Sequence, residues 1–353
     1  MERIRCQKAI AEELGLSQSA VSLALRDMPG VAEKTRKRVK KMAEELGYVP
    51  DPMLTSLADY RKNQRPATFR SVIPWLHSDE HLEGHVKDSP WGLLMEGAAA
   101  RCERLGYRLE PMWLGAEGMT PKRFAKILYS RGINGVVIAP HSSSDEWIDY
   151  AVDAPFSSVA VGTYRLHEFP IDHVNADHYQ NARQLAANVE RLGYRRVGVF
   201  MSRRLDALLI KQYGSLFTRL QEEHQRSAEW SLQLFDEDAT AETFMEWVKR
   251  WEPDALILAN WFHYEQRWAR LPASFRKEYG HLGIALLCVP ERGHESGLTF
   301  SGIHEDLLDV GGSAVDLLAS LIPRQALGKR QRPRRLLVEG QWVAGNTMPS
   351  KPT

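Results

Sequence analysis

Residues 6–48 read CQKAIAEELGLSQSAVSLALRDMPGVAEKTRKRVKKMAEELGY, and this stretch predicts three short amphipathic helices. The first helix ends at Gly15, because the tight turn that follows needs a residue that tolerates positive φ. Ser17 stands where its hydroxyl can cap the second helix, in which apolar residues recur at helical spacing from Val21 to Met28. Two helices joined by such a turn form a helix-turn-helix, whose second helix enters the major groove of DNA.

The charge distribution separates DNA binding from the alternative interpretation, a small helical bundle that binds nothing. Residues 34–41, KTRKRVKK, form a basic run on the solvent side of the third helix. Residues 1–65 contain thirteen Lys and Arg against nine Asp and Glu, a balance of +4, so the remaining chain carries −3 of the total charge of +1. A basic run alone is typical of a solvated helix face. Combined with the helix-turn-helix pattern, it favours a surface that faces phosphates.

A proline-containing break follows the third helix. The residues are Tyr48-Val49-Pro50-Asp51-Pro52, and they end the helix because proline donates no backbone N–H and disfavours helix in the residue before it. The next segment, MLTSLADYRKNQ, predicts one further short helix before an apolar strand begins.

From Cys6 to Leu57 the chain resembles the DNA-binding headpiece and hinge of the lactose repressor family of bacterial transcription regulators. The shared elements are AxExLGLSxxxVSxAL, PGV, TRxRV, AxELGYxP and the leucine of SLA, which recur at fixed offsets. The resemblance implies that Gln18 and Ser19 read base edges, with Ser22 nearby, and Gln can pair bidentately with adenine. It also implies that Leu57 is a wedge for the minor groove, whereas the alternative is an ordinary buried leucine.

Several positions depart from the family pattern. Leu23 stands where the family usually has Arg, and Arg26 is the nearest replacement, one turn further on. Cys6 and Ala32 replace hydroxyl N-caps, which weakens the start of each helix by about 1 kcal/mol. Pro52 falls inside the expected hinge helix, where only the first turn tolerates it. The predicted DNA-contacting residues are Ser17, Gln18, Ser19, Ser22, Arg26, Lys34, Thr35, Arg36, Leu54 and Leu57.

Length and composition are those expected of a cytoplasmic protein of two or three domains. The chain has 353 residues, more than one ordinary core contains, and its hydrophobic content of 43% is typical of globular proteins. No apolar run approaches about 20 residues, and the helical headpiece begins where a signal peptide would stand. Cys6, Cys102 and Cys288 are far apart and offer neither a disulfide framework nor a zinc site.

From Arg70 onward, short apolar strands alternate with amphipathic helices. This alternation implies parallel sheets covered by helices on both faces, and two successive sets of it indicate two lobes with a cleft between them. The tail, 298–343, is expected to cross back between the lobes and complete both sheets. The expected strands are 71–76, 107–113, 135–139, 158–161, 197–200, 231–235, 255–258, 284–289 and 336–338, and the expected helices are 91–105, 121–131, 178–192, 211–224, 241–250, 263–270 and 307–321.

We therefore predict an all-α helix-turn-helix headpiece followed by an α/β domain of two lobes with parallel sheets. This domain resembles the family's effector domain, which is itself similar to periplasmic sugar-binding proteins. The predicted boundaries are 1–50 for the DNA-binding domain, 51–67 for the hinge helix and linker, and 68–353 for the effector-binding and dimerisation domain, with an N-lobe of about 68–163 and 298–322 and a C-lobe of about 164–297 and 323–347.

The effector pocket departs from the family pattern. Lys211 stands where sugar- and purine-binding members carry Arg. An ammonium group, which acts as a point charge, therefore replaces a guanidinium group that can form two parallel hydrogen bonds. Pro290-Glu291 replaces a pair of Asp residues, and Trp261 replaces the acid after Asn260. Tryptophan can stack on a pyranose face, although packing in a core or interface explains each Trp equally well. The predicted effector-contacting residues are His77, Trp91, His141, Lys211, Asn260, Trp261 and Glu291.

No catalytic or metal-binding set emerges from the sequence. Residues 77–85, HSDEHLEGH, bunch three histidines with acids but lack the HExxH order, so neither a metal nor a cofactor is expected. GxSxG, Walker A and GxGxxG patterns do not occur in the sequence, and we predict a protein that is not an enzyme.

The resemblance implies a homodimeric regulator, a repressor by family expectation, that binds a near-palindromic double-stranded DNA operator and no membrane. A small-molecule effector, expected to be a carbohydrate or a related metabolite, would control its affinity for DNA. Two alternatives stay open. One is a sugar-binding protein or sugar-modifying enzyme that carries a helical N-terminal domain, and the other is a constitutive regulator with a non-functional pocket.

Overall fold

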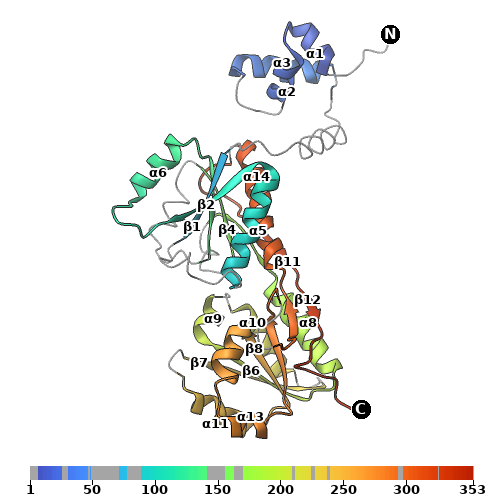
Figure 1. Ribbon diagram of the computed structural model, residues 1–353. Coiled ribbons are helices and arrows are strands. Elements are labelled where there is room, and N and C mark those ends of the chain that lie inside the picture. Colours follow the sequence, from blue (N-terminus) through green and yellow to red (C-terminus); the bar gives the residue numbers. More distant parts are fainter. Residues whose placement is uncertain are drawn as a thin grey trace.

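The molecule consists of a helical headpiece followed by two α/β lobes, between which the chain crosses more than once (Figure 1). This is the predicted order of an all-α headpiece and a two-lobed α/β domain, and the fold class is confirmed. The computed structural model describes residues 7–25, 31–46, 48, 71–77, 89–140, 156–162, 170–208, 211–223, 227–236, 239–292, 297–324 and 326–352.

The headpiece consists of α1 (Gln7–Leu14), α2 (Gln18–Leu25) and α3 (Glu33–Glu45). Ile10 of α1 and Val39 of α3 are 0% exposed and lie in one small apolar core with side chains of α2. The three helices are those that the spacing of apolar residues predicts, because each buries the stripe that repeats every three or four residues.

The N-lobe is the body built on a sheet of six parallel strands in the order β11-β5-β4-β3-β1-β2. Helices α5 and α14 cover one face of this sheet, and α6 covers the other. The elements are β1 (Ser71–His77), α5 (Pro90–Leu105), β2 (Tyr107–Trp113), α6 (Pro121–Ser130), β3 (Gly135–Ile138), β4 (Ser157–Val161), β5 (Asp172–Ala176), α14 (Leu307–Leu321), a 3-10 turn (Ile322–Arg324) and β11 (Arg335–Val338).

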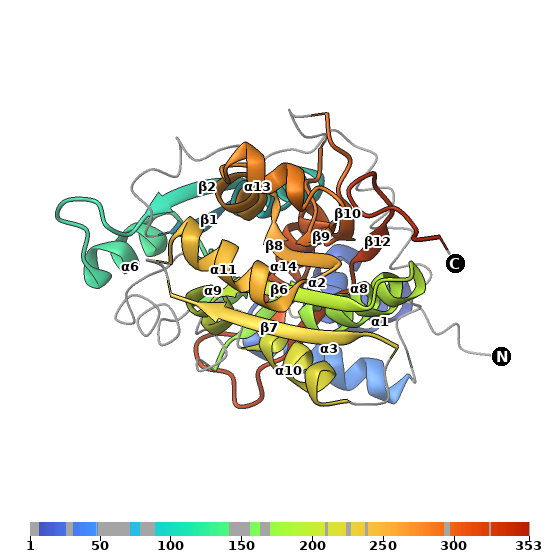
Figure 2. The same ribbon diagram turned by 90° about the horizontal axis from the view of Figure 1, so that it is seen from below.

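The C-lobe is built on a second six-stranded sheet, in the order β12-β10-β9-β8-β6-β7, in which only β12 is antiparallel to its neighbour. Helices α8 and α10 pack on one face and α11 and α13 on the other, as Figure 2 shows from below. The elements are α8 (His178–Arg191), β6 (Arg196–Ser202), α9 (Arg203–Leu208), α10 (Gln212–Glu222), β7 (Glu229–Phe235), α11 (Ala241–Trp251), β8 (Ala255–Asn260), α12 (Trp261–His263), a π-helical turn (Tyr264–Trp268), α13 (Ala273–Glu278), β9 (Gly283–Cys288), β10 (Ser301–His304) and β12 (Gln341–Val343).

The predicted division into lobes is wrong for three strands. β5 belongs to the N-lobe sheet beside β4, and so does β11, although both fall within the predicted C-lobe ranges. β10 belongs to the C-lobe sheet beside β9, although it falls within a predicted N-lobe range. The chain crosses between the lobes after each of these strands, and alternation of strands and helices does not reveal which sheet a strand joins. The expectation that the tail completes both sheets is confirmed.

Helices α5 and α14 approach each other closely over the N-lobe sheet because glycines line their contact. A Cβ atom on Gly97 would overlap the Leu308 carbonyl, and a Cβ atom on Gly311 would overlap the Leu94 carbonyl. Such close packing of two helices requires residues without side chains at the crossing. Among the described helices, none is long and apolar enough to cross a membrane.

Candidate functional site

The turn of the helix-turn-helix has the predicted geometry. Gly15 has a φ of 65°, in the left-handed region, and the Leu16 N–H donates to the Ala11 carbonyl at 2.9 Å. Ser17 Oγ accepts the N–H of Ala20 at 3.2 Å, so the predicted cap of α2 is present. The turn and the cap together fix the direction in which α2 leaves α1.

The first turn of α2 presents polar side chains to solvent. Gln18 and Ser19 are exposed, and Ser22 and Leu23 are partly exposed, whereas Val21 on the other face is completely buried. This is the orientation that base contacts by the start of a recognition helix require. The remaining predicted residues of this region, Arg26, Leu54 and Leu57, lie outside the described residues, as does the predicted hinge, 51–67.

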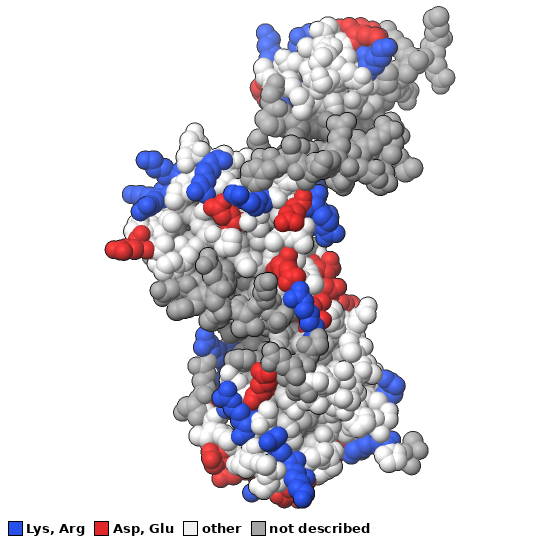
Figure 3. Space-filling view, viewed as in Figure 1, with Lys and Arg blue, Asp and Glu red and all other residues white. Residues whose placement is uncertain are grey.

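The basic run lies on the outer surface of α3, and Figure 3 shows Lys and Arg side chains spread over the headpiece. Five of its cations are exposed. Arg36 is the exception, since its side chain is only 22% exposed and donates to Glu33 at 3.2 Å and to the Val31 carbonyl at 3.4 Å. Ala32 provides no side-chain cap for α3, as predicted from the sequence. The hydrogen bonds of Arg36 stabilise the start of α3 instead. The exposed cations are Lys34, Lys37, Arg38, Lys40 and Lys41, and Thr35 is partly exposed.

The two lobes meet at the carboxyl ends of their parallel strands. After β5 the chain passes into α8 of the C-lobe, and after β10 it returns to the N-lobe in α14. Because the other parallel strands of each sheet run in the same direction, their carboxyl ends lie at this interlobe boundary. Ligands of open α/β sheets bind at the carboxyl ends of strands, so the interlobe boundary is the candidate effector site.

Two aromatic side chains predicted to touch effector lie at the interlobe boundary. Trp261 is partly buried and packs against the apolar core of each lobe. Trp91, in the first turn of α5, is partly buried against the N-lobe core. His77, at the end of β1, is 5% exposed. His141 lies outside the described residues.

Asn260 holds the turn at the end of β8. Its Oδ1 accepts the backbone N–H of His263 at 3.0 Å and lies 3.0 Å from His263 Nδ1. Burial, and then the charge of Arg267, lowers the pKa of His263 from 6.5 to about 4. The Asn260 carbonyl oxygen therefore has two contacts within the protein, and a neutral imidazole lies beside it.

Glu291 and Arg292, which follow β9, also contact other side chains of the protein. Glu291 Oε2 lies 3.0 Å from His304 Nε2, at the end of β10. Arg292 Nη2 donates to Glu96 Oε1 of α5 at 2.7 Å, an ion pair that joins the C-lobe to the N-lobe. The loop that replaces the family's acidic pair therefore contacts the opposite lobe.

Lys211 directly precedes α10 in an uncommon backbone conformation, with a φ of 54°, and it is exposed. The buried Asp206 carboxylate accepts the N–H of Gly214 at 3.0 Å, so a carboxylate of the protein occupies the amino end of α10. Burial raises the pKa of Asp206, against the opposing effects of the Gly214 N–H and of Lys211. A Cβ atom at Gly214 would lie 2.5 Å from Asp206 Oδ1, which explains why glycine stands there.

A buried polar cluster that the sequence analysis missed lies beside the interlobe boundary. We call Glu305, His178, Asn181 and Tyr213 the hinge cluster. Glu305 Oε1 accepts hydrogen bonds from Tyr213 Oη at 2.9 Å and Asn181 Nδ2 at 3.3 Å, and lies 3.0 Å from His178 Nδ1. Burial opposes ionisation of Glu305, but His178 and the hydrogen bonds from Tyr213 and Asn181 outweigh it, so its pKa lies below the ordinary value.

The hinge cluster lies where segments of chain pass from one lobe to the other. Glu305 follows β10 on the way to α14, and Asn181 Oδ1 accepts the N–H of Gly340, between β11 and β12, at 2.8 Å. Asp177, between β5 and α8, donates its N–H to the Val338 carbonyl at 2.8 Å. The members of the hinge cluster are up to 127 residues apart in the sequence, so their spacing gives no signal that they meet.

The headpiece matches a known family by sequence. Residues 8–51 match the family model for bacterial regulatory proteins of the lacI family, which confirms the resemblance of the headpiece. A helix-turn-helix-type transcriptional regulator of Mycobacterium tuberculosis is 25% identical over 196 residues, 55% of this chain and 52% of that protein. The regulator RegA of Clostridium saccharobutylicum is 26% identical over 156 residues, 44% of this chain and 43% of its own. The chain thus spans about half the length of these curated relatives.

Solved structures share the complete architecture. The transcriptional regulator CelR in complex with cellobiose has a TM-score of 0.57 at 16% identity, over 97% of this chain and 99% of that one. The lac repressor dimer bound to operator and the anti-inducer ONPF has a TM-score of 0.53 at 18% identity, over 96% and 97% of the two chains. These likenesses establish a shared fold of headpiece and two lobes.

Proposed function

We propose that this protein is a sequence-specific DNA-binding transcriptional regulator. The exposure of Gln18 and Ser19 at the start of α2 carries the proposal, because that end of a recognition helix contacts base edges in the major groove. The exposed cations of α3 add a surface for phosphates. The match of residues 8–51 to the lacI family supports the same function. The proposal retains Arg26, Leu54 and Leu57 as further DNA contacts.

The proposed regulator acts in the cytoplasm as a homodimer on a near-palindromic operator. Twofold symmetry of the protein places two headpieces on two half-sites related by the same symmetry. The likeness to the operator-bound lac repressor dimer supports this arrangement. The proposal includes no enzymatic activity, and Asn260, Glu291 and Arg292 at the interlobe boundary are engaged in a cap and in ion pairs.

The proposed control is by a small molecule, with a carbohydrate as the expected class, at the interlobe boundary. Trp91 and Trp261 offer apolar faces there, and Lys211 offers an exposed cation. The likeness to a regulator in complex with cellobiose supports a carbohydrate as the class of effector. An effector that favours one arrangement of the lobes would alter DNA affinity by the ratio of its affinities for the two arrangements.

The DNA-binding proposal is tested by selecting a duplex from a randomised palindrome library and measuring its affinity by fluorescence anisotropy. Gln18→Ala should relax the base preference at one position of each half-site, by about 1–3 kcal/mol of discrimination. Gln266→Ala, at an exposed glutamine of the C-lobe, is the matched control. The proposal fails if the wild-type protein selects no sequence and binds no duplex at low salt.

A constitutive regulator with a non-functional pocket is a second candidate, which one observation favours. Asn260, Glu291 and Asp206, the polar groups near the family's ligand positions, are each bonded within the protein. A thermal-shift screen of mono- and disaccharides and related metabolites separates the two candidates. One compound that raises the melting temperature and changes affinity for the selected duplex excludes the constitutive regulator.

A further inference from the structure

A basic connector joins the C-terminal end of α14 to β11. Between residues 322 and 338 the sequence contains six Lys and Arg and no Asp or Glu. All six cations fall within Arg324–Arg335, and five of them are exposed, whereas Arg330 is partly buried. The molecule as a whole carries a charge of only +1, so this segment is a local excess of positive charge, as the basic run 34–41 of the headpiece is. The cations are Arg324, Lys329, Arg330, Arg332, Arg334 and Arg335.

The backbone of the basic connector is held against the N-lobe sheet. The Gly328 N–H donates to the Phe156 carbonyl at 3.2 Å, just before β4 begins. The Arg330 N–H donates to the Pro170 carbonyl at 2.7 Å, just before β5 begins. These two hydrogen bonds fix the backbone of the connector, from which its Lys and Arg side chains extend.

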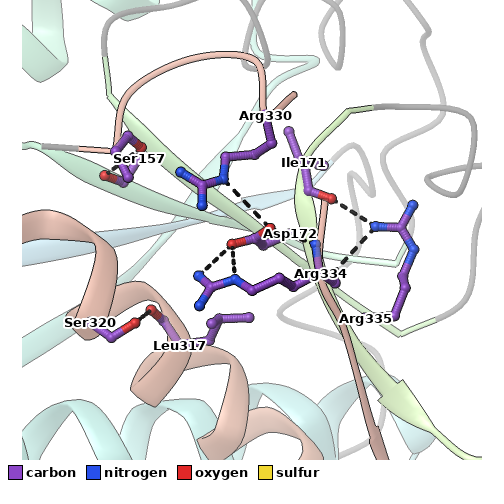
Figure 4. A network of polar contacts seen from close by, with 9 residues as sticks. Ser157, Ile171, Asp172, Leu317, Ser320, Arg330, Arg334 and Arg335 are labelled. Atoms are coloured by element: carbon purple, nitrogen blue, oxygen red, sulfur yellow. Dashed lines mark hydrogen bonds and ion pairs between the residues drawn. The ribbon is translucent and has the colours of Figure 1, made fainter. Parts of the chain in front are cut away.

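A single buried carboxylate anchors the connector. Asp172 is 0% exposed. Its carboxylate accepts three hydrogen bonds from Arg334, from Nε at 2.9 Å, from Nη2 at 2.6 Å and from the backbone N–H at 2.8 Å. Arg330 Nε lies 3.6 Å from the same carboxylate, and Figure 4 shows both guanidinium groups directed at Asp172. Asp172 compensates one charge and fixes two arginines, which leaves a strongly positive surface above it.

The connector lies at the end of the N-lobe from which the headpiece departs. It contacts the residues that precede β4 and β5, at the amino ends of strands, opposite the interlobe boundary. β1 is parallel to these strands and begins at Ser71, directly after the segment that links it to the headpiece. The basic connector and the DNA-binding headpiece are thus attached to the same end of the N-lobe.

We infer that the basic connector is a second DNA-contacting surface, which binds phosphates of the duplex flanking the half-site read by the headpiece. The inference rests on the proposed function. Five arginines and one lysine, with no acidic residue in the connector, match the closely spaced negative charges of a DNA backbone. Contacts of this kind add affinity and salt dependence without adding base preference.

The test compares Arg324→Ala/Arg332→Ala with Lys249→Ala/Arg250→Ala. The first pair lies in the connector region and avoids the side chains bound to Asp172, and the second pair is exposed at the end of α11 in the C-lobe. Each variant removes two positive charges. Affinity is measured against salt concentration on the selected operator duplex, once trimmed to its half-sites and once with flanks of about one helical turn.

The wild-type protein should gain affinity and a steeper salt dependence from the flanks. Arg324→Ala/Arg332→Ala should lose that gain, with the slope of log K against log salt smaller by about 1 to 2 on the flanked duplex and unchanged on the trimmed one. Equal slopes for the two variants on the flanked duplex would overturn the inference and leave an acidic protein surface as the partner to seek. Absence of DNA binding by the wild type would instead overturn the proposed function.

Discussion

At the scale of single residues, Asn260 and Glu291 of the interlobe boundary are engaged within the protein. Sequence reasoning identified Asn260 and Glu291 by their positions, but it did not identify His263 and His304, which contact them at 3.0 Å. A sequence shows which residues stand at the end of a strand, because the pattern of apolar residues locates the carboxyl end of each strand. The partner of a side chain depends on how loops return to the sheet, which periodicity does not encode.

The lowered pKa of His263 makes a prediction at this scale. Its pKa is about 4 in the folded protein and about 6.5 in an unfolded chain, so the unfolded state binds the proton more readily between these values. The neutral imidazole should make its full contribution to the free energy of unfolding above about pH 6.5. This contribution should fall as the pH decreases towards 4. His263→Gln should flatten the decrease of melting temperature between pH 7 and pH 4.5 in a differential scanning calorimetry series.

His281→Gln is the control for this experiment, because His281 is exposed and also lies in the C-lobe. It should leave the pH dependence of the melting temperature close to that of the wild type. An unchanged pH profile in His263→Gln would contradict the assignment of a buried, neutral imidazole at this position.

At the scale of secondary structure, the elements with strong periodicity are the ones that the sequence located. The predicted bounds of α14, 307–321, and of β2, 107–113, agree with the structure. β5 was missed because its sequence, DHVNA, is polar, yet all five residues are buried. Arg334 compensates Asp172, and His173 Nε2 lies 3.0 Å from the Gly162 carbonyl, so distant partners permit a polar strand in a core.

The contact between α5 and α14 predicts opposite results at adjacent glycines. Gly311→Ala should destabilise the protein by about 1–3 kcal/mol, because its Cβ would overlap the Leu94 carbonyl and the two helices would have to separate. Gly312→Ala should be neutral or slightly stabilising, because its Cβ would lie 3.7 Å from Arg101 Cβ, an ordinary contact, and alanine favours helix over glycine. Urea denaturation measures both free energies of unfolding.

The comparison is informative because both substitutions add one methyl group to the same turn of the same helix. If Gly312→Ala were as damaging as Gly311→Ala, the loss would come from general crowding of α14. The close approach of α5 to α14 would then have no specific energetic role.

At the scale of the whole molecule, the hinge cluster is where the two lobes are joined. Glu305 and Asn181 bind one another, while Asn181 also binds Gly340 on another crossover, so one buried group of side chains holds two interlobe segments in register. A change in the arrangement of the lobes must pivot close to these segments, since the chain is continuous there. The sequence predicted that the tail crosses between the lobes, but it could not predict which side chains bind the crossovers, because they come from α8, α10 and the end of β10.

Glu305→Ala should therefore destabilise the protein strongly, by about 3–5 kcal/mol, because it leaves His178, Asn181 and Tyr213 buried without their shared acceptor. Glu305→Gln keeps an acceptor oxygen of similar shape and should cost less. Urea denaturation at pH 7 measures both. Glu229→Gln, at an exposed glutamate of β7, controls for the loss of one negative charge.

The pH dependence of Glu305→Gln then tests whether the charge itself contributes. Because the folded protein lowers the pKa of Glu305, its carboxylate adds stability above the ordinary value of 4.5 and loses that contribution as the pH falls through the lowered value. The stability difference between wild type and Glu305→Gln should thus be largest near neutral pH and shrink below about pH 4.5. A difference that stays constant from pH 7 to pH 3 would mean that Glu305 holds the crossovers by shape and hydrogen bonding alone. In that case, the negative charge of Glu305 would add nothing to the junction of the lobes.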